Sequence, residues 1–406
     1  MMHTRALAEI HAAPAIERIY DDPATGYRAY VVIDSLACGT ATGGIRIRPG
    51  LTLDEIRCAA RTMTWKHRFI GLPNGGAKGG IEAAEGLPRG EKARRLLWLG
   101  RVAADLIDTG IWGIGPDMGT DAALITDLLH SRNLLARRRK FPARFRGSGF
   151  YTACSVVESA GAVLALRGDT LCGKTVAIEG FGSVGSNVAH LISSRGARLV
   201  AVSTSSGALY RPEGLHLEGL LSTPDPLDGD PRARRLPKED LLRLEVDLLM
   251  PCGAGGTIDA GVAHQIAAPV IVPGANCAMG LDAARALHDR RRLAVPDFVS
   301  NCGGILGASL RVGGVPEWMI ESFLKGPFRR RVSAFLRYAR RENGVPLETA
   351  LSTLPPLQGG SAPSGERRLL SWARSAARSR VVPRRPLAIP TYVYFAKHVG
   401  APFRAG

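Results

Sequence analysis

The feature that most constrains the fold of this chain is a glycine-rich turn between a strand-like run and a helix-like run. The β-rich residues 175–179 lead directly into the turn, helical spacing follows over 187–195, and another β run covers 199–203. A GxGxxG turn in this context is the signature of the βαβ unit that binds dinucleotides, because its glycines let the backbone approach a pyrophosphate at a helix N-terminus. We therefore expect an α/β fold with a Rossmann domain, whose turn consists of Gly180, Phe181, Gly182, Ser183, Val184 and Gly185.

The end of the second β run bears on the choice between NAD and NADP. NAD-binding proteins usually carry an acidic residue there, which holds the ribose hydroxyls. This chain has Ser203 and Thr204, followed by two more serines. No anion stands there to repel a 2′-phosphate, and hydroxyl groups also serve NAD. NAD and NADP therefore both stay open.

Three further strand-like runs follow, at 247–250, 270–272 and 293–295. Ligands of open parallel sheets bind beyond the carboxyl ends of the strands, so we expect cofactor contacts from the residues that follow these runs. An asparagine there can instead serve only to cap a turn, and that alternative stays open. The residues are Cys252, Gly253, Asn276 and Asn301.

Two lysines and an aspartate in the first third of the chain predict chemistry at the α-carbon of an amino acid. Helical spacing over 53–69 places Lys66 in a last turn, whereas Lys78 lies among glycines that we expect to bend tightly around a ligand. A lysine held against a second cation and partly desolvated loses proton affinity, so it can act as a general base near neutral pH. The other lysine stays charged and holds a carboxylate. Asp117 follows in a loop of glycine and proline.

The length of 406 residues predicts two domains with an appendage. Helical spacing continues over 315–350, and the segment after it is rich in proline, glycine and arginine. We expect a substrate-binding domain at 1–145, a Rossmann domain at 146–312, C-terminal helices that pack back at 313–350, and a basic tail at 351–406.

The net charge of +17 is concentrated at the C-terminal end, where residues 321–406 carry 14 Arg and 2 Lys against 4 Glu. Such a segment could bind nucleic acid. The chain shows no zinc finger, RNP motif or interleaving of aromatic and basic residues, so we expect a solvated extension and no nucleic-acid partner. The seven cysteines show no CxxC spacing, which argues against a zinc site, and we expect no metal. The start of the chain lacks a long apolar segment and no apolar run reaches about 18 residues, so we expect a cytoplasmic protein without a membrane partner.

Eight short segments occur in an order and at a spacing that resemble the glutamate/leucine/phenylalanine/valine dehydrogenase family, from about residue 20 to residue 310. They are GGIRIRP, MTWK, LPNGGAKGG, GPDMGTD, VAIEGFGSVG, DLLMPC, PGAN and VPDFVSNCGG. The resemblance implies oxidative deamination of an L-amino acid to the 2-oxo acid and ammonia, with hydride transfer to NAD or NADP. It also implies a homo-oligomer that is assembled through the N-terminal domain.

The resemblance also implies roles for single residues. Lys66 would bind the α-carboxylate, Lys78 would be the general base, and Asp117 would shuttle protons beside it. Thr152 would lie near the nicotinamide and Asn276 near its ribose. Asn301 would orient the substrate or the nicotinamide.

The expected substrate pocket departs from that of glutamate dehydrogenases. In those enzymes a lysine that receives the side-chain carboxylate stands at the position of Thr42, and a serine stands at the position of Ala308. Without that cation and hydroxyl, a buried side-chain carboxylate would be unpaired and costly. We therefore expect a branched or aromatic apolar substrate, in a pocket widened by Gly115. The pocket residues are Thr42, Gly44, Lys66, Gly115, Asn301, Ile305 and Ala308.

Three alternatives stay open. Arg46 or another distant residue could replace the missing lysine, which would leave glutamate as the substrate. The chain could also be a glutamate dehydrogenase on other grounds. A third possibility is a non-catalytic relative whose basic tail binds nucleic acid or a partner, although a binding scaffold has no use for Lys66, Lys78 and Asp117 together.

Overall fold

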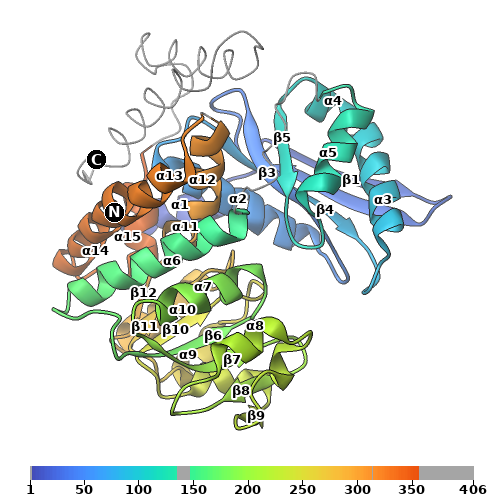
Figure 1. Cartoon of the computed structure of the whole chain (residues 1–406). Coiled ribbons are helices and arrows are strands. Elements are labelled where there is room, and N and C mark those ends of the chain that lie inside the picture. Colours follow the sequence, from blue (N-terminus) through green and yellow to red (C-terminus); the bar gives the residue numbers. More distant parts are fainter. Residues whose placement is uncertain (1, 135–146, 313, 356–406) are drawn as a thin grey trace. The chain divides into compact units, whose positions relative to one another are not determined.

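The computed structural model of the chain describes residues 2–134, 147–312 and 314–355, and these residues form two compact units (Figure 1). The first unit contains residues 10–134 and 354–355, and the second contains residues 2–9 and 147–353. Both units combine helices with a sheet, which confirms the predicted α/β class. The expected basic tail lies outside the described residues except for its first five. No helix among the described residues is long and apolar enough to cross a membrane.

The first unit is built on a mixed sheet with the strand order β1-β2-β4-β3-β5. The strands β1 and β2 pair antiparallel, as do β2 and β4, whereas β4, β3 and β5 run parallel. The apolar core includes Ile33, Ile45 and Trp112. The strands are β1 (Ile16–Asp22), β2 (Tyr27–Ile33), β3 (Ala41–Arg48), β4 (Gly75–Glu82) and β5 (Trp112–Pro116), and the helices are α2 (Leu53–Ile70), α3 (Arg89–Val102), α4 (Ala104–Asp108) and α5 (Ala122–Ser131).

Helix α2 confirms the predicted helix over 53–69, and its local sequence explains both ends. The Thr52 hydroxyl accepts a hydrogen bond from the Glu55 backbone N–H, which satisfies one of the groups left unpaired at a helix start. The helix ends at Gly71, whose φ of 72° is the left-handed conformation that glycine adopts without a steric penalty. Because the helix continues to Ile70, its last turn begins at His67, and Lys66 lies one residue before the turn in which it was expected.

The expected tight bend around Lys78 is wrong, because this residue lies inside the regular strand β4. The neighbouring glycines serve close packing instead. A Cβ atom on Gly76 would lie 2.1 Å from the Ala60 carbonyl oxygen of α2, and one on Gly79 would lie 2.5 Å from the Trp112 ring. Both distances are too short for any side chain, so glycine lets α2 and Trp112 pack directly on the strand.

The second unit has a sheet with the order β12-β11-β10-β6-β7-β8-β9. The strands from β12 to β7 are parallel, and β8 and β9 are antiparallel additions at the edge. The chain order reverses where β6 meets β10, which is the point at which doubly wound sheets bind nucleotides. The strands are β6 (Thr175–Glu179), β7 (Arg198–Ser203), β8 (Ala208–Tyr210), β9 (Arg234–Leu236), β10 (Leu248–Pro251), β11 (Val270–Ile271) and β12 (Leu293–Ala294).

The main helices of the second unit include α6, which runs from Ser148 to Ala165 and is almost wholly buried. The predicted C-terminal helices are present and pack back on it, since Arg329 donates a hydrogen bond of 3.0 Å to the Gly161 carbonyl and lies 3.5 Å from the buried Glu158 carboxylate. The remaining helices include α7 (Ser183–Ser193), α8 (Leu217–Ser222), α9 (Ala260–Gln265), α10 (Leu281–Asp289), α11 (Asp297–Ser300), α12 (Gly303–Val312), α13 (Glu317–Phe323), a π-helical turn (Leu324–Phe328), α14 (Arg329–Arg341) and α15 (Pro346–Thr353).

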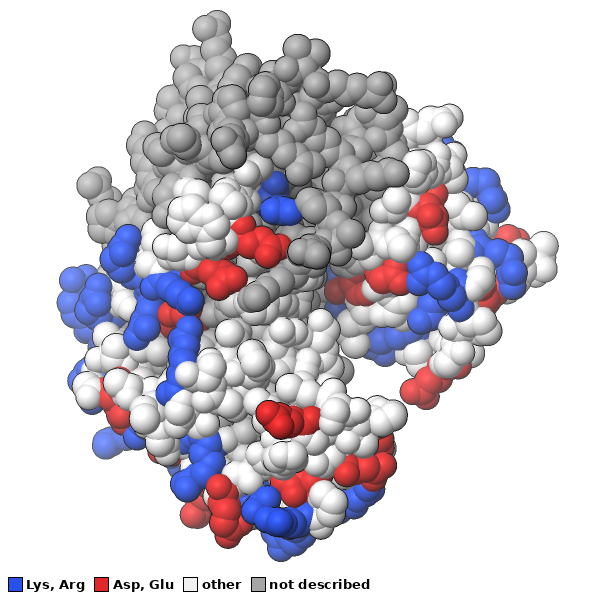
Figure 2. Space-filling model, viewed as in Figure 1, with Lys and Arg blue, Asp and Glu red and all other residues white. Residues whose placement is uncertain are grey.

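The first helix, α1 (Met2–His11), contributes residues 2–9 to this second unit. A side-chain cluster joins them to it, since the Arg285 guanidinium contacts both His3 and Glu348. On the described face shown in Figure 2, acidic and basic side chains alternate without a large area of one sign.

Candidate active site

Lys78 and Asp117 form a buried ion pair in the first unit, with 2.8 Å between Lys78 Nζ and Asp117 Oδ2. Lys78 lies in β4 and is only 3% exposed, whereas Asp117 directly follows β5. The strand β3 runs between these two strands and carries Gly44, where a Cβ atom would lie 3.0 Å from the Asp117 Cβ atom. Glycine on the middle strand therefore leaves room for the aspartate beside the lysine.

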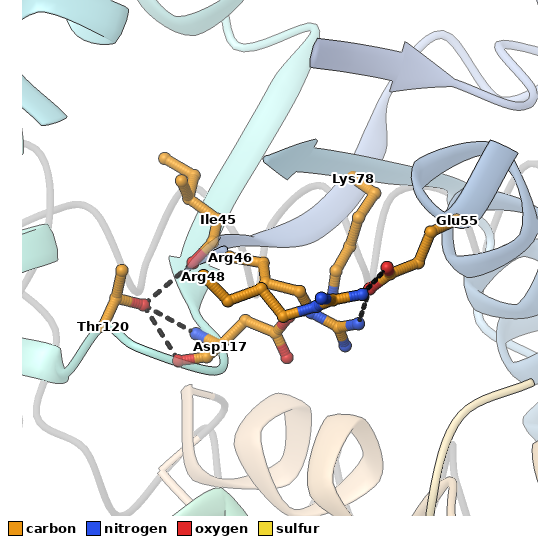
Figure 3. A network of polar contacts seen from close by, with 7 residues as sticks. All are labelled: Ile45, Arg46, Arg48, Glu55, Lys78, Asp117 and Thr120. Atoms are coloured by element: carbon orange, nitrogen blue, oxygen red, sulfur yellow. Dashed lines mark hydrogen bonds and ion pairs between the residues drawn. The ribbon is translucent and has the colours of Figure 1, made fainter. Parts of the chain in front are cut away.

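Hydrogen bonds of the Thr120 hydroxyl stabilise the turn that carries Asp117 (Figure 3). The Asp117 backbone N–H donates a hydrogen bond of 2.9 Å to the Thr120 hydroxyl, and that hydroxyl donates in turn to the Ile45 carbonyl of β3 at 2.9 Å. These bonds tie the loop to the middle strand. The aspartate is thus held in place by its own backbone as well as by its ion pair.

Arg46 of β3 is a third member of this cluster. The sequence did not predict its contact with Asp117. Its Nε atom donates to Asp117 Oδ2 at 2.7 Å, and its Nη1 atom contacts Glu55 Oε1 of α2 at 2.5 Å. Arg48 also binds the Glu55 carboxylate. Alternation along a strand puts Arg46 on the same face as Thr42 and Gly44, and this spacing was the signal available in the sequence. Two of its nitrogen atoms, Nε and Nη1, are thus engaged by carboxylates of the same unit.

The environment shifts the pKa values of the pair in directions that suit proton transfer. Burial lowers the pKa of Lys78, and the nearby Arg46 charge lowers it further, whereas Asp117 opposes both effects. Burial alone would raise the pKa of Asp117, but the charges of Lys78 and Arg46 outweigh it and hold that pKa well below its usual range. Asp117 is therefore an anion at any working pH, and Lys78 releases its proton more readily than a solvated lysine.

Lys66 is buried one residue before the last turn of α2, the helix that packs on β4 through Gly76. Lys66 and Lys78 therefore come from adjacent elements of one unit. The following residue, His67, is fully buried, and this burial lowers its pKa to about 4. The ring is therefore neutral at physiological pH. Thr42 and Gly115 lie in β3 and β5, where Gly115 faces open space because no atom comes within 4 Å of a Cβ built on it.

The glycine-rich turn of the second unit fits a dinucleotide. Gly180 has a φ of 87° and packs against Gly253, and a Cβ atom on Gly185 would lie 2.0 Å from the Gly180 carbonyl oxygen. Gly182, in contrast, faces open space at the N-terminus of α7, and no side chain caps that helix there. The uncapped N–H groups and the open glycine are the features that receive a phosphate. Phe181, Ser183 and Val184 complete the turn.

The structure places the two predicted hydroxyl residues differently from each other. Ser203 is buried at the end of β7, and its hydroxyl accepts a hydrogen bond of 3.1 Å from the Gly180 backbone N–H. This hydrogen bond holds the glycine-rich turn against the end of β7. Thr204 is half-exposed, and its hydroxyl lies 2.9 Å from that of Ser206. Thr204 and the exposed Ser205 and Ser206 therefore carry the accessible hydroxyl groups at the strand end.

Asn301 has a buried acceptor atom that a ligand could use. It is 3% exposed, and its amide nitrogen donates to the Ala275 carbonyl at 2.8 Å and to Asn276 Oδ1 at 3.2 Å. Its Oδ1 atom has no hydrogen-bond partner among the described residues. A buried acceptor without a donor is costly, so a ligand donor such as an amide or hydroxyl of a nicotinamide nucleotide fits this position.

The remaining predicted residues lie in two parts of the second unit, after β10 and on the helices α6 and α12. Cys252 and Gly253 follow β10, and their backbone N–H groups donate to the Glu179 carbonyl and carboxylate at 2.6 Å and 3.2 Å. Thr152 lies in α6 against α12, since a Cβ atom on Gly304 would lie 2.5 Å from its hydroxyl. Ile305 and Ala308 are half-buried on α12. The described residues contain no group of three or more His, Cys, Asp or Glu side chains that could hold a metal ion.

Two family models match this chain. Residues 147–315 match the model for glutamate/leucine/phenylalanine/valine dehydrogenase, and residues 17–129 match the model for the dimerisation domain of Glu/Leu/Phe/Val dehydrogenases. The two matches correspond to the two units and together cover most of the described residues.

Named relatives agree with the family models. The chain is 35% identical over 299 residues to the glutamate dehydrogenase of Thermotoga maritima, a match that covers 69% of this chain and 70% of the relative. It is 33% identical over 298 residues to the NAD-specific glutamate dehydrogenase A of Halobacterium salinarum, which covers 69% and 67%. Among solved structures, a hetero-hexameric glutamate dehydrogenase of Thermus thermophilus in a leucine-bound form superposes with a TM-score of 0.73 at 27% identity, covering 94% of this chain and 96% of the other.

Proposed function

The chain belongs to the glutamate/leucine/phenylalanine/valine dehydrogenase family, and we propose that it deaminates its L-amino acid with Lys78 as the general base and Asp117 as the proton partner of that base. The chain is an NAD(P)-dependent amino-acid dehydrogenase. The observation that carries the proposed roles is the buried ion pair of 2.8 Å between Lys78 and Asp117.

The proposed reaction begins when the neutral Lys78 amine takes a proton from the substrate ammonium group. The bound nicotinamide supplies the hydride acceptor for the substrate Cα atom. Lys78, protonated and held by Asp117, then passes its proton on and accepts another from the water that attacks the substrate iminium carbon. That attack forms a carbinolamine. Lys78 returns its proton to the carbinolamine nitrogen and then takes the hydroxyl proton, so that the C–N bond breaks, ammonia leaves and the 2-oxo acid remains. Lys66 holds the α-carboxylate through its ammonium group, so that Cα and the amine stay in place during both proton transfers.

The cofactor is NAD or NADP, and the second unit offers its binding residues. The turn from Gly180 to Gly185 would receive the pyrophosphate, Thr204 would face the ribose end, and Asn301 with Asn276 would meet the nicotinamide end. The unpaired Oδ1 atom of Asn301 and the open space at Gly182 support this assignment. The hydrogen bond from the Gly180 backbone N–H to the Ser203 hydroxyl supports an indirect role for Ser203 in cofactor binding, through the glycine-rich turn.

We infer that glutamate is the leading substrate, because the named relatives are glutamate dehydrogenases at 31–35% identity. An apolar amino acid is the second candidate. It is favoured by Thr42, which stands where the family resemblance implies a lysine, and by Arg46, whose guanidinium is engaged by Asp117 and Glu55. Ala308 stands where the family resemblance implies a serine, and its side chain offers no hydroxyl group.

One assay separates these candidates. The purified full chain is mixed with each of the proteinogenic amino acids and with NAD or NADP, and reduction of the cofactor is followed by absorbance. A higher kcat/KM for glutamate than for leucine, valine or phenylalanine supports the leading proposal. The reverse order supports the apolar candidate, and no reduction with any amino acid would refute the deamination proposal itself.

We further propose that the chain assembles into a homo-oligomer through its first unit. The support is the match of residues 17–129 to a dimerisation domain and the hetero-hexameric assembly of the Thermus thermophilus relative. Light scattering of the purified chain tests this proposal, since a monomer at all concentrations contradicts it. A single-chain oligomer is the expected result, whereas activity that needs a second, different chain would indicate a hetero-oligomer.

A further inference from the structure

Arg46 binds the same carboxylate oxygen that Lys78 binds (Figure 3). Arg46 Nε lies 2.7 Å from Asp117 Oδ2, and Lys78 Nζ lies 2.8 Å from that atom. Arg46 is 6% exposed, and its other end contacts Glu55 at 2.5 Å. The guanidinium is therefore fixed between two carboxylates, and it shares one of them with the lysine.

This sharing matters at the step in which Lys78 is neutral. A lysine acts as a base only after it has lost its proton, and at that moment its charge no longer balances Asp117. A buried carboxylate without a cation is costly, so the loss of the proton would be resisted. An arginine guanidinium is a permanent cation in proteins, and that of Arg46 binds the same oxygen as Lys78. The carboxylate thus remains paired whether Lys78 is protonated or neutral.

We propose that Arg46 is a positioning residue for proton transfer, which holds Asp117 ionised and in place while Lys78 gains and loses its proton. The proposal rests on the proposed function, in which Lys78 is the base. Glu55 supports the arrangement by fixing the far end of Arg46. The charged groups that face the pair are Arg46 and, through it, Glu55 of α2 and Arg48 of β3.

The variant Arg46→Met tests the proposal through the pH dependence of kcat/KM. Without the arginine, Asp117 is balanced only by protonated Lys78, so the lysine pKa rises. The acidic limb of the profile, which reports loss of the neutral base, should therefore move to higher pH by on the order of one unit. The variant Arg46→Lys keeps a positive charge beside Asp117, so its acidic limb should remain close to that of the unaltered chain.

The variant Glu55→Gln should move the same limb in the opposite direction. Glutamine still accepts a hydrogen bond from Arg46, but a negative charge is lost from the cluster, and the protonated form of Lys78 is stabilised less. The acidic limb should therefore move to lower pH. A role of Arg46 and Glu55 in folding alone does not produce shifts of opposite sign.

Arg48→Met is the matched control, because Arg48 binds the Glu55 carboxylate, whereas Arg46 binds both Glu55 and Asp117. Its acidic limb should move much less than that of Arg46→Met. An unchanged limb in Arg46→Met, or an equal shift in Arg48→Met, would overturn the proposal. Circular dichroism of each variant verifies that the compared proteins are folded.

A second measurement separates the proposal from the proposed function. Cyanate reacts with the neutral form of an amine, so the pH dependence of carbamylation at Lys78, followed by peptide mass spectrometry, reports the lysine pKa without any substrate. If the unaltered chain deaminates no amino acid, the proposed function fails. The carbamylation profile of Arg46→Met should nevertheless move to higher pH, and an unmoved profile would overturn the inference about Arg46.

Discussion

The backbone N–H of Gly76 in β4 donates a hydrogen bond of 2.9 Å to the hydroxyl of Thr64 in α2. The contact joins the strand that carries Lys78 to the helix that carries Lys66. It is possible only because Gly76 has no side chain, since a Cβ atom there would lie 2.2 Å from the Thr64 backbone nitrogen. The spacing of the two lysines therefore depends on a glycine that touches neither of them.

Replacement of Gly76 by alanine should force α2 away from β4. The clash involves backbone atoms, which cannot rotate out of the way, so we expect a loss of about 1–3 kcal/mol in the free energy of unfolding, measured by denaturant titration. Gly90→Ala is the matched control, because a Cβ atom on Gly90 meets nothing within 4 Å. Equal stability of the two variants would show that the close contact does not exist.

Lys78→Ala should abolish turnover without loss of cofactor binding. Removal of a general base lowers kcat by about 10²–10⁴-fold, whereas the glycine-rich turn that would bind the nucleotide belongs to the other unit. Turnover is followed by cofactor reduction, and binding by fluorescence titration with NADH or NADPH. Near-normal turnover would refute the assignment of the base. Loss of cofactor binding as well would instead indicate a general structural defect.

His67 should make the stability of the protein fall as the pH is lowered from about 6.5 toward 4. Its folded-state pKa is lowered to about 4 by burial, so the unfolded chain binds a proton in this window and the folded chain does not. The contribution is present in full above pH 6.5 and amounts to on the order of 3 kcal/mol. Unfolding free energies measured across this range should fall less steeply for His67→Leu, and parallel curves would contradict the buried neutral ring.

Thr42→Lys should shift substrate preference toward glutamate. The residue is half-buried in β3, and a lysine there offers the side-chain carboxylate a charged hydrogen bond. Because such a bond contributes about 1.5–3 kcal/mol, the ratio of kcat/KM for glutamate to that for leucine should rise by roughly tenfold or more. Thr42→Met controls for size without charge. An unchanged ratio would remove Thr42 from the substrate pocket.

Thr204→Asp should make the enzyme favour NAD. An anion at the end of β7 can hold the ribose hydroxyls of NAD and repels the 2′-phosphate of NADP. The KM for NADP should therefore increase by about tenfold or more, while the KM for NAD changes little. Thr204→Asn keeps the size without the charge and should leave the NADP value nearly unaltered. A similar change for both cofactors would place Thr204 away from the ribose.

Local patterns in the sequence were sufficient for several of these elements. The GxGxxG turn and the helix with Lys66 each depend on residues within a few positions of one another. The strand β5 before Asp117 was not predicted, because its glycines and proline indicated a loop. Backbone hydrogen bonding and glycine conformation act over that range. The family resemblance added the expected roles of Lys78, Asp117 and Asn301, because the quoted segments occur together and in order.

The sequence by itself thus determined the fold class, the position of the glycine-rich turn and the residues from which the chemistry is proposed. Tertiary structure alone decided that Lys78 lies in a strand, because the need for glycine there comes from α2 and Trp112, which local sequence does not reveal. It also decided that Arg46 and Asp117, 71 residues apart, share an ion pair, and that Asn301 keeps an unpaired acceptor. The distances between elements are set by how their side chains pack in three dimensions, and no periodicity along the chain encodes them.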